Sequence, residues 1–143
     1  MNENYVKVEM ATASENVSFA RIAVAGFLAN LDPTVDEISD IKTAVSEAVT
    51  NAIIHGYEDC DGIVTMQLSC VDREITIEIS DNGVGIENVE TVREPMFTTK
   101  PDLERSGLGF TVMESFMDSV EVNSTPGAGT TVIMTKKLGA LPQ

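Results

Sequence analysis

A change in the spacing of apolar residues, between residues 56 and 63, narrows the choice of folds. From 34 to 56, apolar residues recur every three or four positions, which predicts an amphipathic helix that buries one stripe. The recurring residues are Ile38, Ile41, Val45, Ala48 and Ala52. From 63 to 79, apolar and polar residues alternate on both sides of a charged turn at 72–74, which predicts a β-hairpin. A helix stripe and a sheet face that must both be buried predict an α/β fold.

The rest of the sequence adds further strands and helices. These are a strand over 5–10, a helix from an N-cap at Ser14 to about residue 30, a helix over about 108–117, and strands over 119–124 and 130–136. The second helix begins near Thr34, where Glu37 three residues on completes a capping-box pattern. We expect a single domain over 1–143, an α/β two-layer sandwich with a mixed, mostly antiparallel sheet and helices on one face.

Charge and cysteine content narrow the possible partners. Nine basic and 23 acidic residues give a net charge of −14, which argues against nucleic acid because neutralising phosphates needs clustered Lys and Arg. An acidic surface suits a basic protein partner, or serves solubility alone. Cys60 and Cys70, with a single His in the chain, indicate free thiols rather than a zinc site. No apolar stretch reaches the length of a membrane span and residues 1–10 lack a signal pattern, so we expect a cytoplasmic protein without membrane contact.

Two polar residues of the second predicted helix, Glu47 and Asn51, are four positions apart and therefore share a face. A carboxylate and a carboxamide beside an apolar stripe could hold a metal ion and orient a nucleophile. A pair that only hydrogen-bonds to itself on the helix surface also fits this spacing.

A first glycine motif, Asp81-Asn-Gly-Val-Gly85, ends an apolar strand. Gly83 and Gly85 would let the backbone turn sharply and approach a flat ligand. Asp81 could accept a hydrogen bond from an adenine amino group. A simple turn also fits this motif.

A second glycine motif, Ser106-Gly-Leu-Gly109, opens a predicted helix whose free N–H groups could bind phosphate. Arg105 and Lys100 place positive charge just upstream. The segment 95–101 between the two motifs is expected to be a functional loop, or a surface loop with incidental basic residues. The sequence contains neither a P-loop nor the HRD and DFG motifs, which excludes the eukaryotic kinase fold.

The order of these motifs resembles the GHKL ATPases, a superfamily that includes gyrase-type subunits, Hsp90, histidine kinases and the anti-sigma serine kinases. The boxes are Glu47-x-x-x-Asn51, Asp81-x-Gly83-x-Gly85, Gly107-x-Gly109 and Gly129-Thr130. Within the superfamily, the chain is most similar to the sporulation anti-sigma serine kinases that act on a sigma factor of the F type. Stress-response anti-sigma kinases are the near alternative. The resemblance runs from about residue 4 to about residue 137, and is carried by 18–21, 31–34, 46–57, 97–101 and 103–107.

The resemblance implies roles for individual residues. Glu47 would be the general base for an incoming serine hydroxyl, and Asn51 would hold the Mg²⁺ ion that bridges the ATP phosphates. Asp81 would bind the adenine amino group, with Thr130 nearby through a water. Arg21 would contact protein partners. The turns around the nucleotide and the lid above it would involve Gly83, Gly85, Thr98, Thr99, Lys100, Arg105, Ser106, Gly107 and Gly109, with Arg105 reaching the γ-phosphate.

The resemblance also implies a switch that depends on ATP and ADP. A homodimer with ATP would sequester the sigma factor from RNA polymerase. A dephosphorylated anti-anti-sigma protein would displace the sigma factor and be phosphorylated on serine, and the ADP form would stay with it. Such a cycle requires a different partner affinity in each nucleotide state.

Two other functions remain to be compared with this one. A histidine kinase needs a phosphoacceptor histidine on a separate hairpin, whereas the sole histidine, His55, ends the second predicted helix. A module that binds ATP or a partner without transferring phosphate would not need a base, and the presence of Glu47 argues against it.

Overall fold

The computed structural model describes residues 3–56, 62–82, 105–125 and 128–139. Its strands are β1 (Glu3–Ala11), β2 (Ile63–Val71), β3 (Glu74–Asp81), β4 (Ser119–Thr125) and β5 (Gly129–Lys137). Its helices are α1 (Asn16–Leu28), the 3-10 turn η1 (Ala29–Leu31), α2 (Val35–Asn51), the π-helical turn η2 (Ala52–Gly56) and α4 (Arg105–Phe116).

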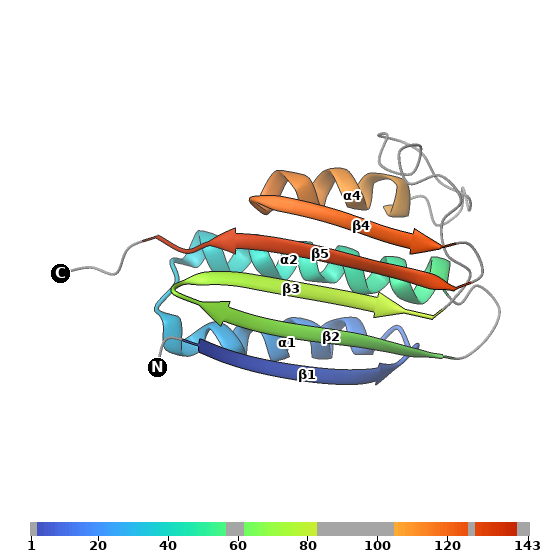
Figure 1. The fold of residues 1–143 in the computed structure, drawn as a ribbon, viewed down its shortest axis with the longest axis horizontal. Helices are drawn as coiled ribbons and strands as arrows, with labels where there is room; N and C mark the ends of the chain where they lie inside the picture. The colour runs from blue at the N-terminus through green and yellow to red at the C-terminus, as the bar shows by residue number, and fades with distance from the viewer. Residues whose placement is uncertain (1–2, 57–61, 83–104, 126–127, 140–143) are drawn as a thin grey trace.

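The strands form one sheet in the order β1-β2-β3-β5-β4, and α1, α2 and α4 cover one of its faces (Figure 1). This arrangement confirms the two-layer α/β sandwich. Every pairing between described strands is antiparallel, so the part of the sheet that the structure describes contains no parallel pair.

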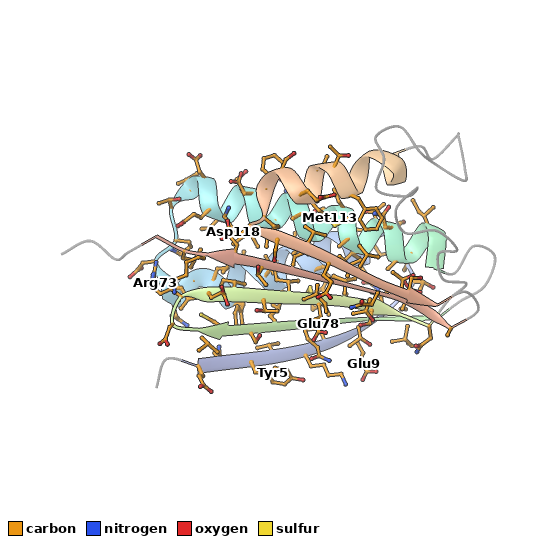
Figure 2. All side chains as sticks on the ribbon, turned by 45° about the horizontal axis from the view of Figure 1, so that its top comes forward. Tyr5, Glu9, Arg73, Glu78, Met113 and Asp118 are labelled. Carbon is orange, nitrogen blue, oxygen red and sulfur yellow. The ribbon has the colours of Figure 1, made fainter. Side chains whose placement is uncertain are left out.

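The core lies between the helices and the covered face of the sheet. Along β2 and β3 every second residue is buried, as the alternating sequence predicts. Met113 of α4 is fully buried on this side (Figure 2). Glu78 is flanked on β3 by the buried Ile77 and Ile79, and therefore projects from the opposite face. One face of the sheet is thus packed and the other carries polar side chains.

The capping box predicted for α2 is present. The backbone N–H of Glu37 donates to the Thr34 hydroxyl at 3.0 Å, and the N–H of Thr34 donates to the Glu37 carboxylate at 2.8 Å. The predicted helix continues through η2, but its last turn is π-helical rather than α-helical. Val49, outside the predicted stripe, is also fully buried, because α2 packs against both α1 and α4 as well as the sheet.

Two helix starts differ from the sequence prediction. Ser14 is not the N-cap of α1, because its carbonyl accepts the N–H of Val17 within the preceding turn and Glu15 takes the N-cap position. Helix α4 begins at Arg105, about three residues earlier than predicted. Glycine is a poor helix former, and the packing of α4 along α2 extends the helix through Gly107 and Gly109.

The β2–β3 turn lies at the end of the sheet where the described chain begins and ends. Asp72 and Arg73 adopt positive φ angles of 49° and 70°, as a two-residue hairpin turn requires. The Arg73 side chain donates to the carbonyls of Leu31 and Gly139, each at 2.7 Å. Glu3 pairs with Val71 at the same end.

Candidate functional site

The opposite end of the sheet brings together three polar side chains from three strands. Asp81 of β3 lies directly opposite Thr130 of β5, and Ser124 of β4 lies opposite Thr130 on its other side. The row continues the register of Ile79 and Val132, so it faces the helices. Asp81 is buried, with 7% of its surface exposed. Strand ends therefore supply a buried carboxylate beside two hydroxyl groups.

A cavity of about 660 Å³ opens at these strand ends. This volume is in the range of small-molecule sites in proteins. Its lining comes from β3, β4 and β5 and the residues beside them, and is mostly polar. The lining residues are Ser80, Asp81, Asn82, Val122, Asn123, Ser124, Ala128, Gly129, Thr130 and Thr131.

Close backbone packing shapes this cavity at Gly129. The residue has a φ of 106°, which side chains rarely allow. A Cβ built there would lie 2.1 Å from the carbonyl oxygen of Asp81 and 2.8 Å from Cα of Asn82. Glycine is therefore required where β5 starts, because the backbone of β3 occupies the space.

The C-terminal end of α2 supplies the other two central residues. Figure 1 places this end beside the tip of β3, and η2 packs against β3 and β5. Asn51 is buried with 8% of its surface exposed, and Glu47 is half-buried one helical turn before it. Asn51 itself does not line the cavity at the strand ends.

The side chain of Asn51 is unusual for a buried amide. Neither its oxygen nor its nitrogen has a hydrogen-bond partner among the residues that the structure describes. Such an unsatisfied buried group costs about 1–3 kcal/mol. The carboxamide oxygen is a suitable Mg²⁺ ligand, so the donor chemistry at this position fits a metal-bound nucleotide.

The remaining predicted site residues fall into three groups. The N-terminal turns of α4 contain Arg105, Ser106, Gly107 and Gly109, and α4 lies along α2. The second group, Gly83, Gly85, Thr98, Thr99 and Lys100, lies outside the described residues. Arg21 is the third group. It is exposed on α1, which packs against α2, β1 and β2, away from the strands that line the cavity.

Sequence reasoning missed Ser124. Its hydroxyl donates to the carbonyl of Gly129 at 3.1 Å and lies 2.7 Å from the Thr130 hydroxyl. The only sequence signal was the turn at 125–129, which brings the two strands together across a short loop.

The fold agrees with that of a known domain family. A family model described as the histidine kinase-like ATPase domain matches residues 10–136. Among curated proteins, the chain is 57% identical over 141 residues to the anti-sigma F factor of Clostridium acetobutylicum, covering 99% of both chains. It is 58% identical over 138 residues to the anti-sigma F factor of Clostridium perfringens, covering 95% of this chain and 98% of that one. The chain therefore belongs to the anti-sigma F factor family of histidine kinase-like ATPase domains.

Solved structures support the fold assignment. The RsbU and RsbW domains of a Mycobacterium tuberculosis protein match with a TM-score of 0.68 and 19% identity, covering 94% of this chain and 32% of that one. The histidine kinase domain of a blue-light activated kinase from Erythrobacter litoralis matches with a TM-score of 0.61 and 19% identity, covering 87% and 60%. At this identity the likeness concerns the fold alone. No helix in the described part of the chain is long and apolar enough to cross a membrane.

Proposed function

We propose that this protein is an ATP-dependent anti-sigma factor that also acts as a protein-serine kinase. It sequesters a sporulation sigma factor of the F type and phosphorylates the anti-anti-sigma protein that opposes it. The observation that carries the proposal is the buried carboxamide of Asn51, which lacks a hydrogen-bond partner among the described residues. Its helix continues into η2, which packs against two of the strands that line the polar cavity. The names of the relatives supply the choice of a sigma factor as partner.

The nucleotide in this proposal is ATP, with ADP as its product. Asp81 and Thr130 are cross-strand neighbours that both line the cavity, and their oxygen atoms suit an adenine amino group. The N-terminus of α4 suits the phosphates, because its free N–H groups and dipole favour anions. Single-domain organisation over 1–143 is part of the same proposal.

Glu47 and Asn51 have different roles in phosphoryl transfer. Mg²⁺, when bound, neutralises charge on the phosphates, and the Asn51 oxygen would hold it. The Glu47 carboxylate, one turn away on α2, would orient the serine hydroxyl and accept its proton. A carboxylate is a modest base, so its position relative to the hydroxyl contributes more than its basicity.

Partner binding involves a different part of the molecule. Arg21 stands on α1 with the exposed Phe19 and Ile22, which are 50% and 70% exposed. A charged residue among exposed apolar side chains is typical of a protein interface. We assign this surface to the sigma factor and the anti-anti-sigma protein. A homodimer formed through α1 and the edge strand β1, working in the cytoplasm, completes the proposal.

The test is transfer of labelled γ-phosphate from ATP, with Mg²⁺, to a serine of a purified anti-anti-sigma protein. Wild type should label the partner. Glu47→Gln, which keeps the side-chain size, should reduce the rate by at least about a hundredfold while still binding ATP. The matched control Glu121→Gln, exposed on β4, should transfer at the wild-type rate.

Other outcomes point to other functions. Tight ATP binding without label on the partner would indicate a binding module that does not transfer phosphate. Equal rates for wild type and Glu47→Gln would remove Glu47 from the mechanism. Capture of a stress-response sigma factor in preference to the sporulation one would move the protein to the alternative branch of anti-sigma kinases.

A further inference from the structure

We propose that Ser124 determines base specificity by orienting the Thr130 hydroxyl so that it can only accept a hydrogen bond from the nucleotide. The inference rests on the proposed binding of ATP at this cavity. It assigns to a β4 residue a role in selecting a purine with an amino group at position 6.

The direction of the hydrogen bonds follows from the atoms involved. A carbonyl oxygen can only accept, so in the 3.1 Å contact with Gly129 the Ser124 hydroxyl is the donor. Serine has one hydroxyl hydrogen, which this contact uses. Either oxygen could donate in the 2.7 Å contact between the two hydroxyls. With the Ser124 hydrogen on the Gly129 carbonyl, we take Thr130 as the donor to Ser124. The two hydrogen bonds thus run from the Thr130 hydroxyl to the Ser124 hydroxyl, and from the Ser124 hydroxyl to the Gly129 carbonyl.

This direction leaves only acceptor lone pairs on the Thr130 oxygen for a ligand. Asp81, directly opposite on β3, is an acceptor as well when ionised. Two adjacent acceptors suit the amino group at position 6 of adenine and disfavour the carbonyl at position 6 of hypoxanthine. A water held by Thr130 would give the same preference, because its second hydrogen would reach N1, which accepts in adenine and carries a proton in hypoxanthine.

A purely structural role for Ser124 makes a different prediction. Ser124 and Gly129 flank the turn between β4 and β5, so their contact could serve only to close the hairpin. Loss of such a contact would weaken ATP and inosine triphosphate binding to the same extent. A role in specificity changes the ratio of the two dissociation constants.

The experiment measures Kd for ATP and for inosine triphosphate, each with Mg²⁺, by titration calorimetry on the full chain. In Ser124→Ala, the Thr130 hydrogen is released and can turn toward the carbonyl of hypoxanthine. The ratio of the two Kd values should then fall by about three- to tenfold, the equivalent of one hydrogen bond. Ser124→Thr keeps the hydroxyl and should keep the wild-type ratio.

Two further variants test the two hydrogen bonds that link Thr130, Ser124 and Gly129. Ser119→Ala removes the other β4 serine whose hydroxyl pairs with a β5 threonine, Thr135, at 2.5 Å, and should leave the ratio unchanged. Thr130→Val removes the oxygen that Ser124 orients, so adding Ser124→Ala to it should have no further effect on the ratio. If Ser124→Ala does not fold, Ser124→Cys, with a weak donor and acceptor, carries the same expected fall.

The possible results separate this inference from the proposed function. An unchanged ratio in Ser124→Ala, or an equal loss of both affinities, would overturn the role of Ser124 while leaving ATP binding intact. Wild-type protein that binds neither nucleotide would instead refute the proposed function, and this inference with it. Wild-type protein that binds both equally well would refute selection by Thr130.

Discussion

Gly129 lies so close to Asp81 that a Cβ on the glycine would stand 2.1 Å from the aspartate carbonyl oxygen. The start of β5 is thus pressed against the end of β3, where the candidate base-binding carboxylate emerges. Backbone packing and the candidate binding site are therefore coupled at one residue, which leads to the first prediction.

Gly129→Ala should destabilise the fold and weaken ATP binding together. The new methyl group meets backbone atoms that cannot rotate away, and its φ of 106° adds strain of about 1–3 kcal/mol. Thermal unfolding and ATP titration would show both losses. Gly26→Ala is the matched control: its Cβ meets nothing within 4 Å in α1, so it should stabilise by about 0.5–1 kcal/mol. Equal effects of the two substitutions would contradict the packing argument.

Replacement of Asn51 by leucine should weaken the binding of ATP with Mg²⁺ and raise the stability of the free protein. Asn51→Leu removes a buried amide that has no hydrogen-bond partner among the described residues, and should raise the free energy of unfolding of the nucleotide-free protein by about 1 kcal/mol. It should also abolish the rise in melting temperature that ATP with Mg²⁺ produces. Asn51→Asp keeps an oxygen ligand, so it should lower the stability of the free protein and retain the Mg²⁺-dependent rise. A free protein destabilised by leucine would show that the amide is already satisfied.

Stability should fall in acid through Glu37. Hydrogen bonds from the backbone of Thr34 and then of Gly139 hold the pKa of the Glu37 carboxyl below its ordinary value of 4.5. A group whose pKa is lower in the folded state stabilises the fold at pH values above its pKa in the unfolded state. This stabilisation is lost as the pH falls through its pKa in the folded state. Glu37→Gln should therefore cost about 0.5–1 kcal/mol at pH 7, since the residue is only partly buried, and less at pH 3, below the ordinary pKa.

Urea unfolding at the two pH values would measure this difference. Asp36→Asn, in the same first turn of α2 and exposed, is the control for the loss of a carboxylate near the helix N-terminus. A Glu37→Gln penalty that is the same at both pH values would refute the linkage.

Lys136 should stabilise α4 through its C-terminal carbonyl rather than through its ion pair. Its ammonium donates to the carbonyl of Phe116, the last residue of α4, at 2.8 Å, and lies 4.0 Å from Asp40 of α2. Lys136→Met keeps the apolar stem but loses the cap, which should cost about 1–2 kcal/mol in chemical unfolding. Asp40→Asn removes only the long ion pair and should cost less than about 0.5 kcal/mol. An equal loss of stability in Lys136→Met and Asp40→Asn would show that Lys136 acts through its ion pair with Asp40.

The elements that sequence reasoning predicted well depend on near neighbours in the chain. The capping box at Thr34 and Glu37 and the hairpin around Asp72 use contacts within a few residues, so their patterns are visible locally. The start of α4 was placed too late, because glycine at 107 and 109 indicates a loop while contact with α2 favours a helix.

The candidate site was only partly visible for the same reason. The motifs indicate Asp81 and Asn51, but the missing hydrogen-bond partners of the Asn51 amide, within the part of the chain that the structure describes, depend on what surrounds it after folding. The contribution of Ser124 depends on cross-strand neighbours and on the direction of a hydroxyl hydrogen. Neither property has a signature in residue order.

The first and last described residues, Glu3 and Gly139, both lie beside the β2–β3 turn, at the end of the sheet away from Asp81. A fluorescent protein or second module joined at that end would therefore lie far from the candidate site.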